Sequence, residues 1–258
     1  MLKVNNLNLQ FGSLVLARDV SFTLKPGQVT AILGPNGTGK STLLKTLFGD
    51  IKVDSGDIGF GDEHLTPKTL AKWRSRFGYM PQDIHFDIGL SVVEVILLGR
   101  IDALSLRVDE TLLSEALDIL DSMGLAHLAN RDVRTLSGGQ CQMMLFAQAL
   151  MRKPQIMMLD EPVSALDLHY QHVLLEHLRQ QTQQHNYTTV MVLHDLNLAA
   201  QYADNLLVLK GGELVATGDP KQILTAELVE DIYNVKAQVF CDESGVPFVR
   251  TLRSNQAA

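Results

Sequence analysis

The sequence contains little cysteine and no long apolar run, and both shortages restrict what the chain can be. Only two cysteines, Cys141 and Cys241, occur among the 258 residues, and they lie far apart. A disulfide framework or a cysteine metal cluster needs more cysteines at closer spacing, so we expect a chain that folds in a reducing compartment. The N-terminus lacks the apolar stretch of a signal peptide, and no other segment approaches the roughly 20 apolar residues that span a bilayer. The composition therefore predicts a soluble, cytosolic protein.

Positive charge is also scarce. The chain has 22 lysines and arginines against 29 aspartates and glutamates, a formal net charge of −7. This balance argues against a protein that binds nucleic acid through a basic surface, so no nucleic-acid partner is expected. Hydrophobic residues make up 46% of the chain, enough to bury a substantial core. At ~150 residues per domain, the length corresponds to one large domain or to a core with a sizeable insertion.

Three short apolar runs each end at residues able to do chemistry. The runs are 29–33, 156–159 and 188–193. They lead into Gly34, Asp160 and His194, respectively. Continuous apolar runs of this length are typical of strands buried on both faces, and hence of a largely parallel sheet covered by helices. In such α/β folds ligands bind beyond the carboxyl ends of the strands, so we expect the site there.

Weaker patterns predict further elements around this sheet. Short antiparallel strands are expected at 7–9 and 20–24. A hairpin is expected to join 206–209 to 213–216. Over 109–123 the period is helical, and one apolar stripe is expected to be buried. Its members are Leu112, Leu113, Ala116, Leu117, Ile119 and Leu120.

These patterns divide a single domain, residues 1–258, into three parts. The α/β core takes residues 1–90 and 135–219, and a helical segment, 91–134, is inserted into it. Residues 220–258 are the third part, in which we expect a helix and a terminal hairpin. The helix is predicted over 221–233, and the hairpin pairs 238–240 with 247–249.

The strongest single pattern follows the first buried run. It reads Gly34-Pro35-Asn36-Gly37-Thr38-Gly39-Lys40-Ser41-Thr42 and fits the phosphate loop G-x-x-x-x-G-K-[ST]. Its glycines let backbone N–H groups point at phosphate oxygens, and the helix that begins near Gly39 adds its positive end. Lys40 is placed to reach the β- and γ-phosphates of ATP, and the Ser41 hydroxyl to bind Mg²⁺. The alternative is a glycine-rich turn between strand and helix.

Two adjacent carboxylates, Asp160 and Glu161, follow the second buried run. Carboxylates that leave a sheet interior are costly without a cation or a hydrogen-bond partner. We assign Asp160 to the Mg²⁺ shell and Glu161 to the general base that polarises the attacking water. The alternative is an acidic turn before Pro162, which is a weak reading beside a phosphate loop.

Two single residues are further candidates. His194, at the end of the third run, could reach the γ-phosphate, although a lone histidine at a strand end is more often structural. Phe11 could stack on the adenine ring, although a single phenylalanine is more often part of a core. The functional reading of both residues therefore depends on the other motifs.

A second glycine cluster, Leu136-Ser137-Gly138-Gly139-Gln140, precedes a helical run over 141–152 that is apolar nearly all round. Ser137 is a natural N-cap for this helix, and a glycine-lined helix start can bind phosphate. The first loop, however, already has such a site for its own nucleotide. A second half-site in one chain suggests that two chains close head to tail, each offering Ser137 to the other's ATP.

In their order these motifs resemble the nucleotide-binding subunit of an ATP-binding cassette (ABC) transporter, over essentially the whole chain. The set is Phe11, residues 34–42, Gln82 in Met80-Pro81-Gln82-Asp83, residues 136–140, Asp160-Glu161, Ser164-Ala165-Leu166-Asp167 and His194. The resemblance implies a P-loop NTPase core with a mainly parallel sheet, an N-terminal antiparallel β subdomain and an inserted helical subdomain. It also implies that Gln82 joins the Mg²⁺ shell and senses nucleotide. Asp167 would bridge a homodimer, and the helical insertion would dock on two multi-span permease subunits.

Three residues depart from the family pattern. Cys141 stands where arginine is common, Val163 where threonine is common, and Gln148 where arginine is frequent. None of them is expected to touch nucleotide or metal. The departures therefore put in doubt some local salt bridges and the rate of ATP hydrolysis, but not the reaction itself. Cys141 is expected to be a buried small hydrophobe.

Within the family, residues 93–100, 164–169 and 194–204 are similar to importers of iron chelates, haem and cobalamin. The similarity implies an ATP-hydrolysing subunit that is peripheral to the cytoplasmic face of the inner membrane. An extracytoplasmic substrate-binding protein would act with it indirectly. Zinc and manganese importers have similar segments and are an alternative. Two further alternatives are a soluble cassette ATPase that serves no transporter and a regulator that binds ATP without hydrolysing it.

Overall fold

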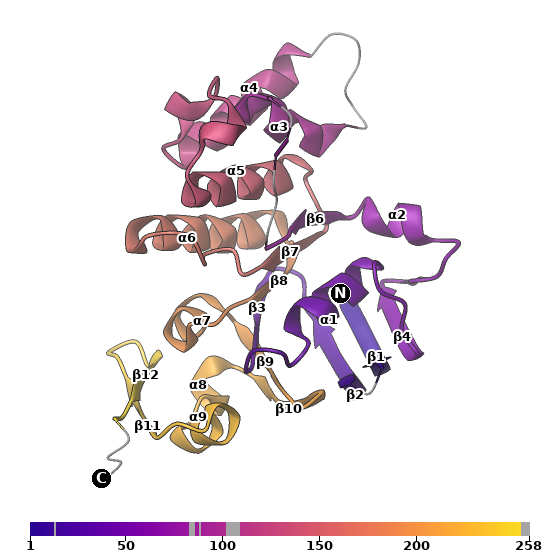
Figure 1. Cartoon of the computed structure of the whole chain (residues 1–258), viewed down its shortest axis with the longest axis vertical. Helices are drawn as coiled ribbons and strands as arrows, with labels where there is room; N and C mark the ends of the chain where they lie inside the picture. The colour runs from indigo at the N-terminus through magenta and orange to yellow at the C-terminus, as the bar shows by residue number, and fades with distance from the viewer. Residues whose placement is uncertain (13, 83–85, 88, 102–108, 254–258) are drawn as a thin grey trace.

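A six-stranded sheet lies at the centre of the molecule (Figure 1). The computed structural model describes residues 1–12, 14–82, 86–87, 89–101 and 109–253. The strands of the central sheet are β3 (Gln28–Leu33), β6 (Phe77–Met80), β7 (Ile156–Asp160), β8 (Thr188–Val192), β9 (Asn205–Lys210) and β10 (Glu213–Gly218). Their order is β10-β9-β3-β8-β7-β6, and every neighbouring pair is parallel except β9 and β10. The three apolar runs are thus adjacent parallel strands, as predicted.

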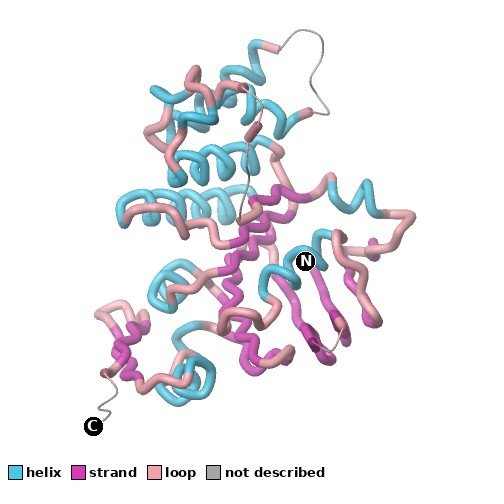
Figure 2. Tube along the Cα trace, in the orientation of Figure 1, coloured by secondary structure: helices cyan, strands magenta, loops and turns pink. Residues whose placement is uncertain are grey.

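Helices cover both faces of this sheet (Figure 1, Figure 2). They are α5 (Gly138–Met151), α6 (Leu168–His185) and α7 (Leu196–Tyr202) on one face and α1 (Lys40–Phe48) on the other. Successive side chains of a strand point to opposite faces. Met157 and Leu159 of β7 accordingly pack in the cluster that contains α5 and α6, whereas Met158 packs with Leu44 and Leu47 of α1. The pattern confirms strands that are buried on both sides.

A second, antiparallel sheet packs against α1. Its strands are β1 (Leu2–Phe11), β2 (Leu14–Leu24), β4 (Ser55–Phe60) and β5 (Glu63–His64), in the order β2-β1-β4-β5. The antiparallel pair predicted near the N-terminus is confirmed, but both strands are longer than expected. Asn6 and Asp19 have φ of 47° and 51°, and the pairing of β1 with β2 shifts register there. These irregularities break the alternation by which a strand is detected.

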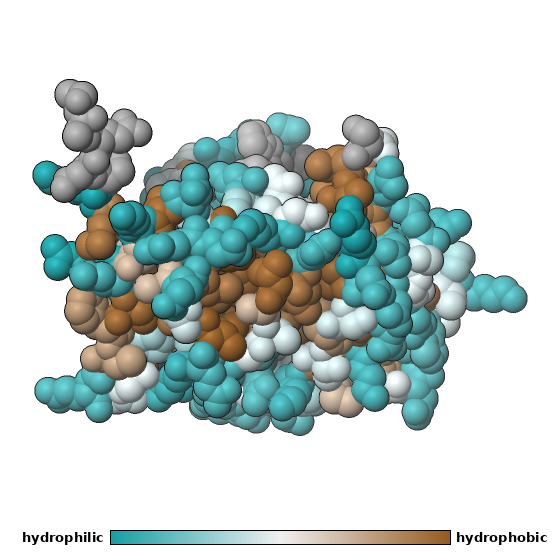
Figure 3. Space-filling model, turned by 90° about the horizontal axis from the view of Figure 1, so that it is seen from below, coloured by the Kyte–Doolittle hydropathy of each residue, from teal (hydrophilic) through white to brown (hydrophobic). Residues whose placement is uncertain are grey.

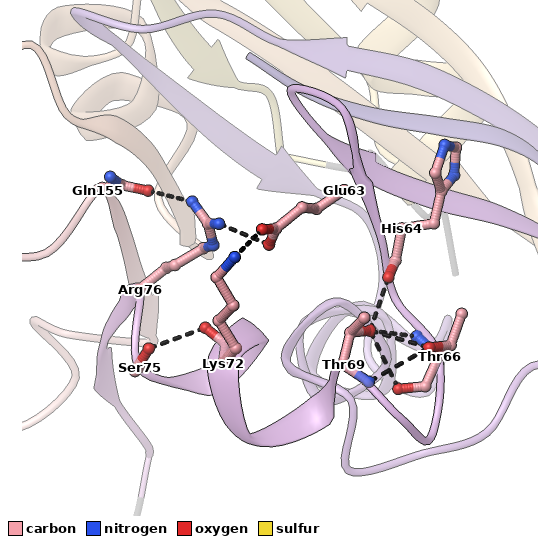
Figure 4. Close-up of polar contacts among 8 residues, drawn as sticks. All are labelled: Glu63, His64, Thr66, Thr69, Lys72, Ser75, Arg76 and Gln155. Atoms are coloured by element: carbon pink, nitrogen blue, oxygen red, sulfur yellow. Dashed lines mark hydrogen bonds and ion pairs between the residues drawn. The ribbon is translucent and has the colours of Figure 1, made fainter.

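A polar network ties the edge of the antiparallel sheet to the short helix α2 (Leu70–Arg74) and to the central sheet (Figure 4). Glu63 of β5 accepts hydrogen bonds from Lys72 and Arg76, and these two cations lower the pKa of Glu63. The Arg76 guanidinium also donates to Oε1 of Gln155 at 2.6 Å. Gln155 immediately precedes β7, so the network joins the second sheet to the strand that carries the acidic pair.

The described residues between β6 and α5 are mainly helical. They contain α3 (Val92–Leu97), η1 (Leu98–Arg100), α4 (Glu110–Ser122), η2 (Ala126–Leu128) and η3 (Val133–Thr135). Helices α3 and α4 pack on α5 (Figure 1). The helix predicted over 109–123 is confirmed as α4. Asp109 caps it by accepting from the Thr111 N–H at 2.9 Å.

The apolar stripe predicted for α4 is wrong in part. Leu112, Ala116 and Leu120 are buried, but Leu113 and Leu117 are 38% and 37% exposed. The buried residues are four positions apart, so they form one narrow line along the helix. Ile119 beside this line is partly buried against the same core, whereas Leu113 and Leu117 stay at the surface.

The C-terminal part follows β10 and packs against α7. It consists of α8 (Pro220–Ile223), α9 (Ala226–Tyr233), β11 (Ala237–Cys241) and β12 (Pro247–Thr251). The single helix predicted over 221–233 is wrong, because Leu224 leaves the helical region with ψ of 83°. Thr225 then caps a new helix by accepting from the Leu228 N–H at 3.2 Å. The terminal hairpin is confirmed as β11 paired with β12.

Apolar surface is gathered on part of the molecule. Figure 3 shows a band of apolar residues across the underside, between hydrophilic margins. In the C-terminal hairpin, Phe240 and Phe248 pair across the strands and are 50% and 53% exposed.

Within the part of the chain that the structure describes, no helix has the length and apolar character needed to cross a membrane.

Candidate nucleotide site

The phosphate loop joins β3 to α1, where the sequence predicts it. Gly34 has φ of 148°, and a Cβ at this position would lie 2.3 Å from the backbone oxygen of Leu209 on β9. Gly39 is the N-cap of α1 and has φ of 88°. Because glycine has no side chain to cap the helix, the first N–H groups of α1 remain available to an anion.

Lys40 is buried inside the loop, with 5% of its surface exposed. Its Nζ donates to the carbonyl oxygens of Gly34 at 2.8 Å and Pro35 at 2.9 Å. Burial lowers the pKa of Lys40, and the carboxylates of Glu161 and Asp160 oppose that change. The loop's own carbonyls thus hold the ammonium group where a phosphate could replace them as its acceptor.

Ser41 and Asp160 meet although they are far apart in the chain. The Ser41 hydroxyl donates to Oδ1 of Asp160 at 2.8 Å. Asp160 is 2% exposed, and burial raises the pKa of its carboxyl, which the hydrogen bond from Ser41 acts to lower. A hydroxyl and a carboxylate are oxygen ligands of the kind that Mg²⁺ takes. The pair fits this ion because a cation would offset the cost of burying the carboxylate.

Asp160→Asn is expected to raise the melting temperature of the nucleotide-free chain at neutral pH. Burial raises the pKa of Asp160 in the folded state. The folded chain therefore binds this proton more tightly than the unfolded chain, and ionisation of Asp160 works against folding. An amide of the same shape removes that cost. Thermal unfolding followed by circular dichroism checks the shift, and the advantage of D160N should shrink as the pH falls through the folded-state pKa.

Asp132→Asn is the matched control for this prediction. Its hydrogen bonds with Arg134 lower the pKa of Asp132 to about 2. The ionised carboxylate of Asp132 therefore favours folding, and its removal should lower the melting temperature or leave it unchanged. A melting temperature of D160N below that of wild type at neutral pH would contradict the burial argument.

Glu161 lies at the centre of a cluster of three predicted residues. Its Oε1 is 2.6 Å from Nε2 of His194, and its Oε2 accepts from Nε2 of Gln82 at 3.0 Å. The three residues follow the neighbouring strands β6, β7 and β8, which explains why the fold brings them together. Glu161 has φ of 52°, an unusual conformation for a residue with a side chain.

A cleft of about 700 Å³ opens over this cluster and over the phosphate loop. The predicted residues that line it are Phe11, Asn36, Gly37, Gly39, Lys40, Ser41, Thr42, Gln82, Glu161 and His194. The other predicted residues of the site, Gly34, Pro35, Thr38 and Asp160, do not line it. They support it from behind, since Asp160 bonds Ser41 and the Thr38 hydroxyl donates to Pro35 O at 2.8 Å.

Phe11 is 76% exposed, so the alternative that it belongs to a core is wrong. Leu14, Leu16 and Ile51 also line the cleft, and sequence reasoning missed them. No motif marks these three residues. Their place depends on how β2 and the loop after α1 fold over the phosphate loop, which no local pattern predicts.

The second glycine cluster begins α5. Ser137 caps the helix by accepting from the Gln140 N–H at 3.2 Å, and Oε1 of Gln140 accepts from the Ser137 N–H at 3.1 Å. This reciprocal capping confirms Ser137 as the N-cap. The helix begins at Gly138, three residues before the predicted helical run. The sequence pattern did not predict this first turn, because glycine is unfavourable in a helix interior.

A second cavity, of about 430 Å³, lies at this helix start. Residues 137–140 line it together with Asp167 and Tyr170. Asp167 is the N-cap of α6 and accepts from the Tyr170 N–H at 2.9 Å. Among the described residues, none lines both this cavity and the cleft over the phosphate loop. The second glycine cluster therefore does not reach the nucleotide cleft of its own chain.

The residues that depart from the family pattern are placed away from the cleft. Gln148 donates from Nε2 to the carbonyl of Val95 at 2.9 Å and so joins α5 to α3. Val163 is buried. Cys141 is half-buried, and burial raises the pKa of its thiol, which keeps it protonated at neutral pH.

Comparison with known proteins decides the family. The family profile described as ABC transporter matches residues 17–164. A hemin import ATP-binding protein, HmuV of Shewanella denitrificans, is 37% identical over 256 residues, which cover 96% of this chain and 100% of the relative. The chain belongs to the ABC transporter family.

Further relatives agree with this membership. HmuV of Photobacterium damselae subsp. damselae is 42% identical, with 92% of this chain and 91% of the relative covered. The ferric enterobactin transport ATP-binding protein FepC of Escherichia coli is 37% identical, with 96% and 93% covered. The predicted resemblance to the ABC nucleotide-binding subunit, and within it to importers of iron complexes, is confirmed.

Solved structures of ABC proteins share the fold. An ABC transporter of the metal-chelate type in an inward-facing conformation has a TM-score of 0.84 and 29% identity, with 99% of this chain and 98% of that chain covered. The dimeric cassette MJ0796 has a TM-score of 0.76 and 28% identity, with 85% and 98% covered. The predicted α/β P-loop fold and the predicted activity are confirmed. This ABC protein is a nucleotide-binding ATPase.

Proposed function

We propose that the chain is the ATP-hydrolysing subunit of an importer for an iron complex, such as haem or a ferric siderophore. The observation that carries the proposal is the similarity to relatives named for hemin import and ferric enterobactin transport, at 37% to 42% identity over more than nine-tenths of both chains. Two copies would serve two multi-span permease subunits at the cytoplasmic face of the inner membrane. A substrate-binding protein on the outer side would deliver the cargo.

The cleft is proposed to hold ATP along the phosphate loop. Backbone N–H groups of residues 37–42 and the Lys40 ammonium bind the phosphates, and Phe11 stacks on the adenine. Magnesium would be held by Ser41, Asp160 and Gln82, and when bound it supplies charge neutralisation between the β- and γ-phosphates. Lys40 exchanges its two loop carbonyls for phosphate oxygens. Because the ammonium group is already buried, this exchange carries no further cost of burying a charge.

The reaction is phosphoryl transfer from ATP to water, and the cluster around Glu161 orients it. Glu161 accepts a hydrogen bond from the attacking water at one carboxylate oxygen, which aims the water at the γ-phosphate, and takes its proton as the bond from water to phosphorus forms and ADP leaves. The bond from Gln82 and the contact with His194 hold the carboxylate in place. His194 is proposed to reach the γ-phosphate and so to couple its presence to the base. Most of the catalysis is positioning, because little covalent chemistry is left for the protein.

A head-to-tail homodimer is proposed to complete each site. In support of this proposal, the residues assigned to the two half-sites of one chain line separate cavities. The second glycine cluster, Ser137, Gly138, Gly139 and Gln140, would bind the γ-phosphate held by the other chain, with Asp167 bridging the two chains. ATP then binds the closed dimer with both half-sites and the open state with one, so its binding can drive closure.

Ser137→Arg is expected to lower the ATPase rate by at least about 100-fold, since a long cation at the helix start blocks the partner's phosphate. ATP affinity of the isolated chain should stay within about twofold, because Ser137 does not line the cleft over its own phosphate loop. Ser75→Arg, at the exposed end of α2, is the control. Phosphate release and equilibrium binding of a fluorescent ATP analogue measure the two quantities. An unchanged rate in S137R would remove the shared site.

Reconstitution tests the cargo. The chain is co-purified with the membrane proteins it binds and is placed in proteoliposomes that enclose ATP, with the substrate-binding protein outside. ATP-dependent uptake is then compared for haem, a ferric siderophore, cobalamin, Zn²⁺ and Mn²⁺. Uptake of haem or the siderophore supports the proposal, whereas uptake of Zn²⁺ or Mn²⁺ alone would assign a metal-ion importer. Failure to recover any multi-span membrane protein would favour a soluble cassette ATPase.

A further inference from the structure

A short loop between β7 and α6 carries two residues of the proposed site. This loop, residues 161–167, begins with Glu161 and ends with Asp167. Glu161 holds a positive φ of 52°, a conformation that persists only where the surroundings fix it. The groups that hold this loop therefore decide where the carboxylate lies.

Gln142 of α5 binds loop 161–167 at residues 161, 164 and 165. Gln142 is 6% exposed, and its side-chain amide makes three hydrogen bonds to the loop. Nε2 donates to Oγ of Ser164 at 2.8 Å and to the carbonyl oxygen of Glu161 at 3.4 Å. Oε1 accepts from the backbone N–H of Ala165 at 3.0 Å. One side chain thus joins the backbone of Glu161 to Ser164 and Ala165.

A second glutamine, Gln171 of α6, binds loop 161–167 at residues 163 and 166. Its Nε2 donates to the carbonyl oxygens of Leu166 at 3.1 Å and Val163 at 3.3 Å. Helices α5 and α6 lie side by side (Figure 1). The loop is therefore fixed from two helices, and only one of them, α5, begins at the second glycine cluster.

We propose that Gln142 is a positioning residue that links the second glycine cluster to the general base of the same chain. The inference rests on the proposed roles of Ser137 and Glu161. Gln142 lies in the second turn of α5, close behind the capped start that would receive the partner's nucleotide. A helix moves as a rigid body, so a shift of α5 when Ser137 engages phosphate is carried by Gln142 to the backbone of Glu161. Binding of the partner's nucleotide at Ser137 thereby changes the position of Glu161 in the other nucleotide site.

The test compares two methionine variants of the purified full-length chain. Gln142→Met keeps the length of the side chain and its apolar stem but loses all three hydrogen bonds. Gln148→Met, on the same helix, loses only the bond to Val95 and leaves loop 161–167 untouched. Q142M is expected to lower kcat at least about tenfold, because a small misplacement of a catalytic group has effects of this size. KM for ATP should stay within about twofold, and Q148M should keep kcat within about twofold.

Ser164→Ala keeps the inference testable if Q142M folds poorly. Ser164 is exposed, and its removal deletes only one of the three bonds, so the melting temperature should not change. S164A is expected to lower kcat about threefold with KM unchanged. A kcat of S164A equal to that of wild type, or a loss in Q142M that appears in KM rather than in kcat, would assign Gln142 to packing alone.

A double variant separates failure of this inference from failure of the proposed catalytic role. In a Glu161→Gln background the base is already absent, so adding Q142M should cause no further loss of residual hydrolysis. A further tenfold loss in that background would overturn the link through Glu161. If E161Q is inactive while Q142M matches Q148M, the positioning role is wrong and the base stands. If E161Q keeps its turnover, the assignment of the base is itself wrong.

Discussion

Glu161→Gln is expected to abolish steady-state ATP turnover, with a fall in kcat of at least about 1,000-fold, while ATP binding is retained. The amide cannot accept the proton of the attacking water. It can keep the local geometry, because an amide of the same shape can still accept from Gln82 with one end and contact His194 with the other. The phosphate loop is not altered by this change. Steady-state phosphate release and equilibrium ATP binding measure the two effects separately.

The E161Q variant should also accumulate as an ATP-bound dimer. If ATP drives closure and hydrolysis reopens the dimer, a chain that binds but does not hydrolyse ATP stays closed. Size-exclusion chromatography with ATP and Mg²⁺ is expected to show dimer for E161Q and mainly monomer for wild type. Glu176→Gln, which changes an exposed carboxylate on α6, is the control and should behave as wild type. Turnover in E161Q within tenfold of wild type would remove Glu161 as the base.

Residues that are close in sequence could be predicted with their geometry. The phosphate loop follows an apolar run, and both the strand and the helix that it joins are found where they are expected. The same is true of Ser137, whose capping role depends only on the next three residues. In each case the local backbone determines the function, so no long-range contact needs to be known.

Contacts between distant residues were predictable only where the sheet supplies a rule. Ser41 and Asp160 meet because parallel strands bring their carboxyl ends to one edge, and the same rule brings Glu161 to His194. The partners of Gln142 follow from no such rule. They depend on how α5 packs against loop 161–167, and a glutamine within an apolar helical run gives no sign of its target.

The errors of prediction have the same origin. Leu113 and Leu117 fit a helical stripe, yet packing leaves them at the surface, since the area that α4 buries depends on its neighbours. The break between α8 and α9 depends on Thr225, whose capping bond competes with continuation of the helix. Hydrophobic periodicity detects each helix, but it does not decide how much of the apolar face is covered or which polar residue ends the helix.

Gly34→Ala is expected to have the largest effect on stability. A Cβ at this position would lie 2.3 Å from the backbone oxygen of Leu209, and φ of 148° is itself unfavourable for alanine. The obstacle is the backbone of a central strand, which cannot move without disturbing the sheet. We expect a loss of at least about 3 kcal/mol in the free energy of unfolding. This corresponds to a fall in melting temperature of roughly 6–12 °C for a domain of this size.

The same substitution should remove nucleotide binding, because relieving the collision with Leu209 displaces the backbone of the phosphate loop, including the Gly34 carbonyl that accepts from Lys40. Gly124→Ala is the matched control, since Gly124 also has positive φ, 72°, but a Cβ there meets nothing within 4 Å. It should cost only about 1 kcal/mol, from backbone strain alone, and leave ATP binding unchanged. Chemical denaturation and ATP binding of both variants separate strain from collision. Equal losses of stability in G34A and G124A would contradict this prediction. They would show that the phosphate loop moves away from Leu209 at little cost.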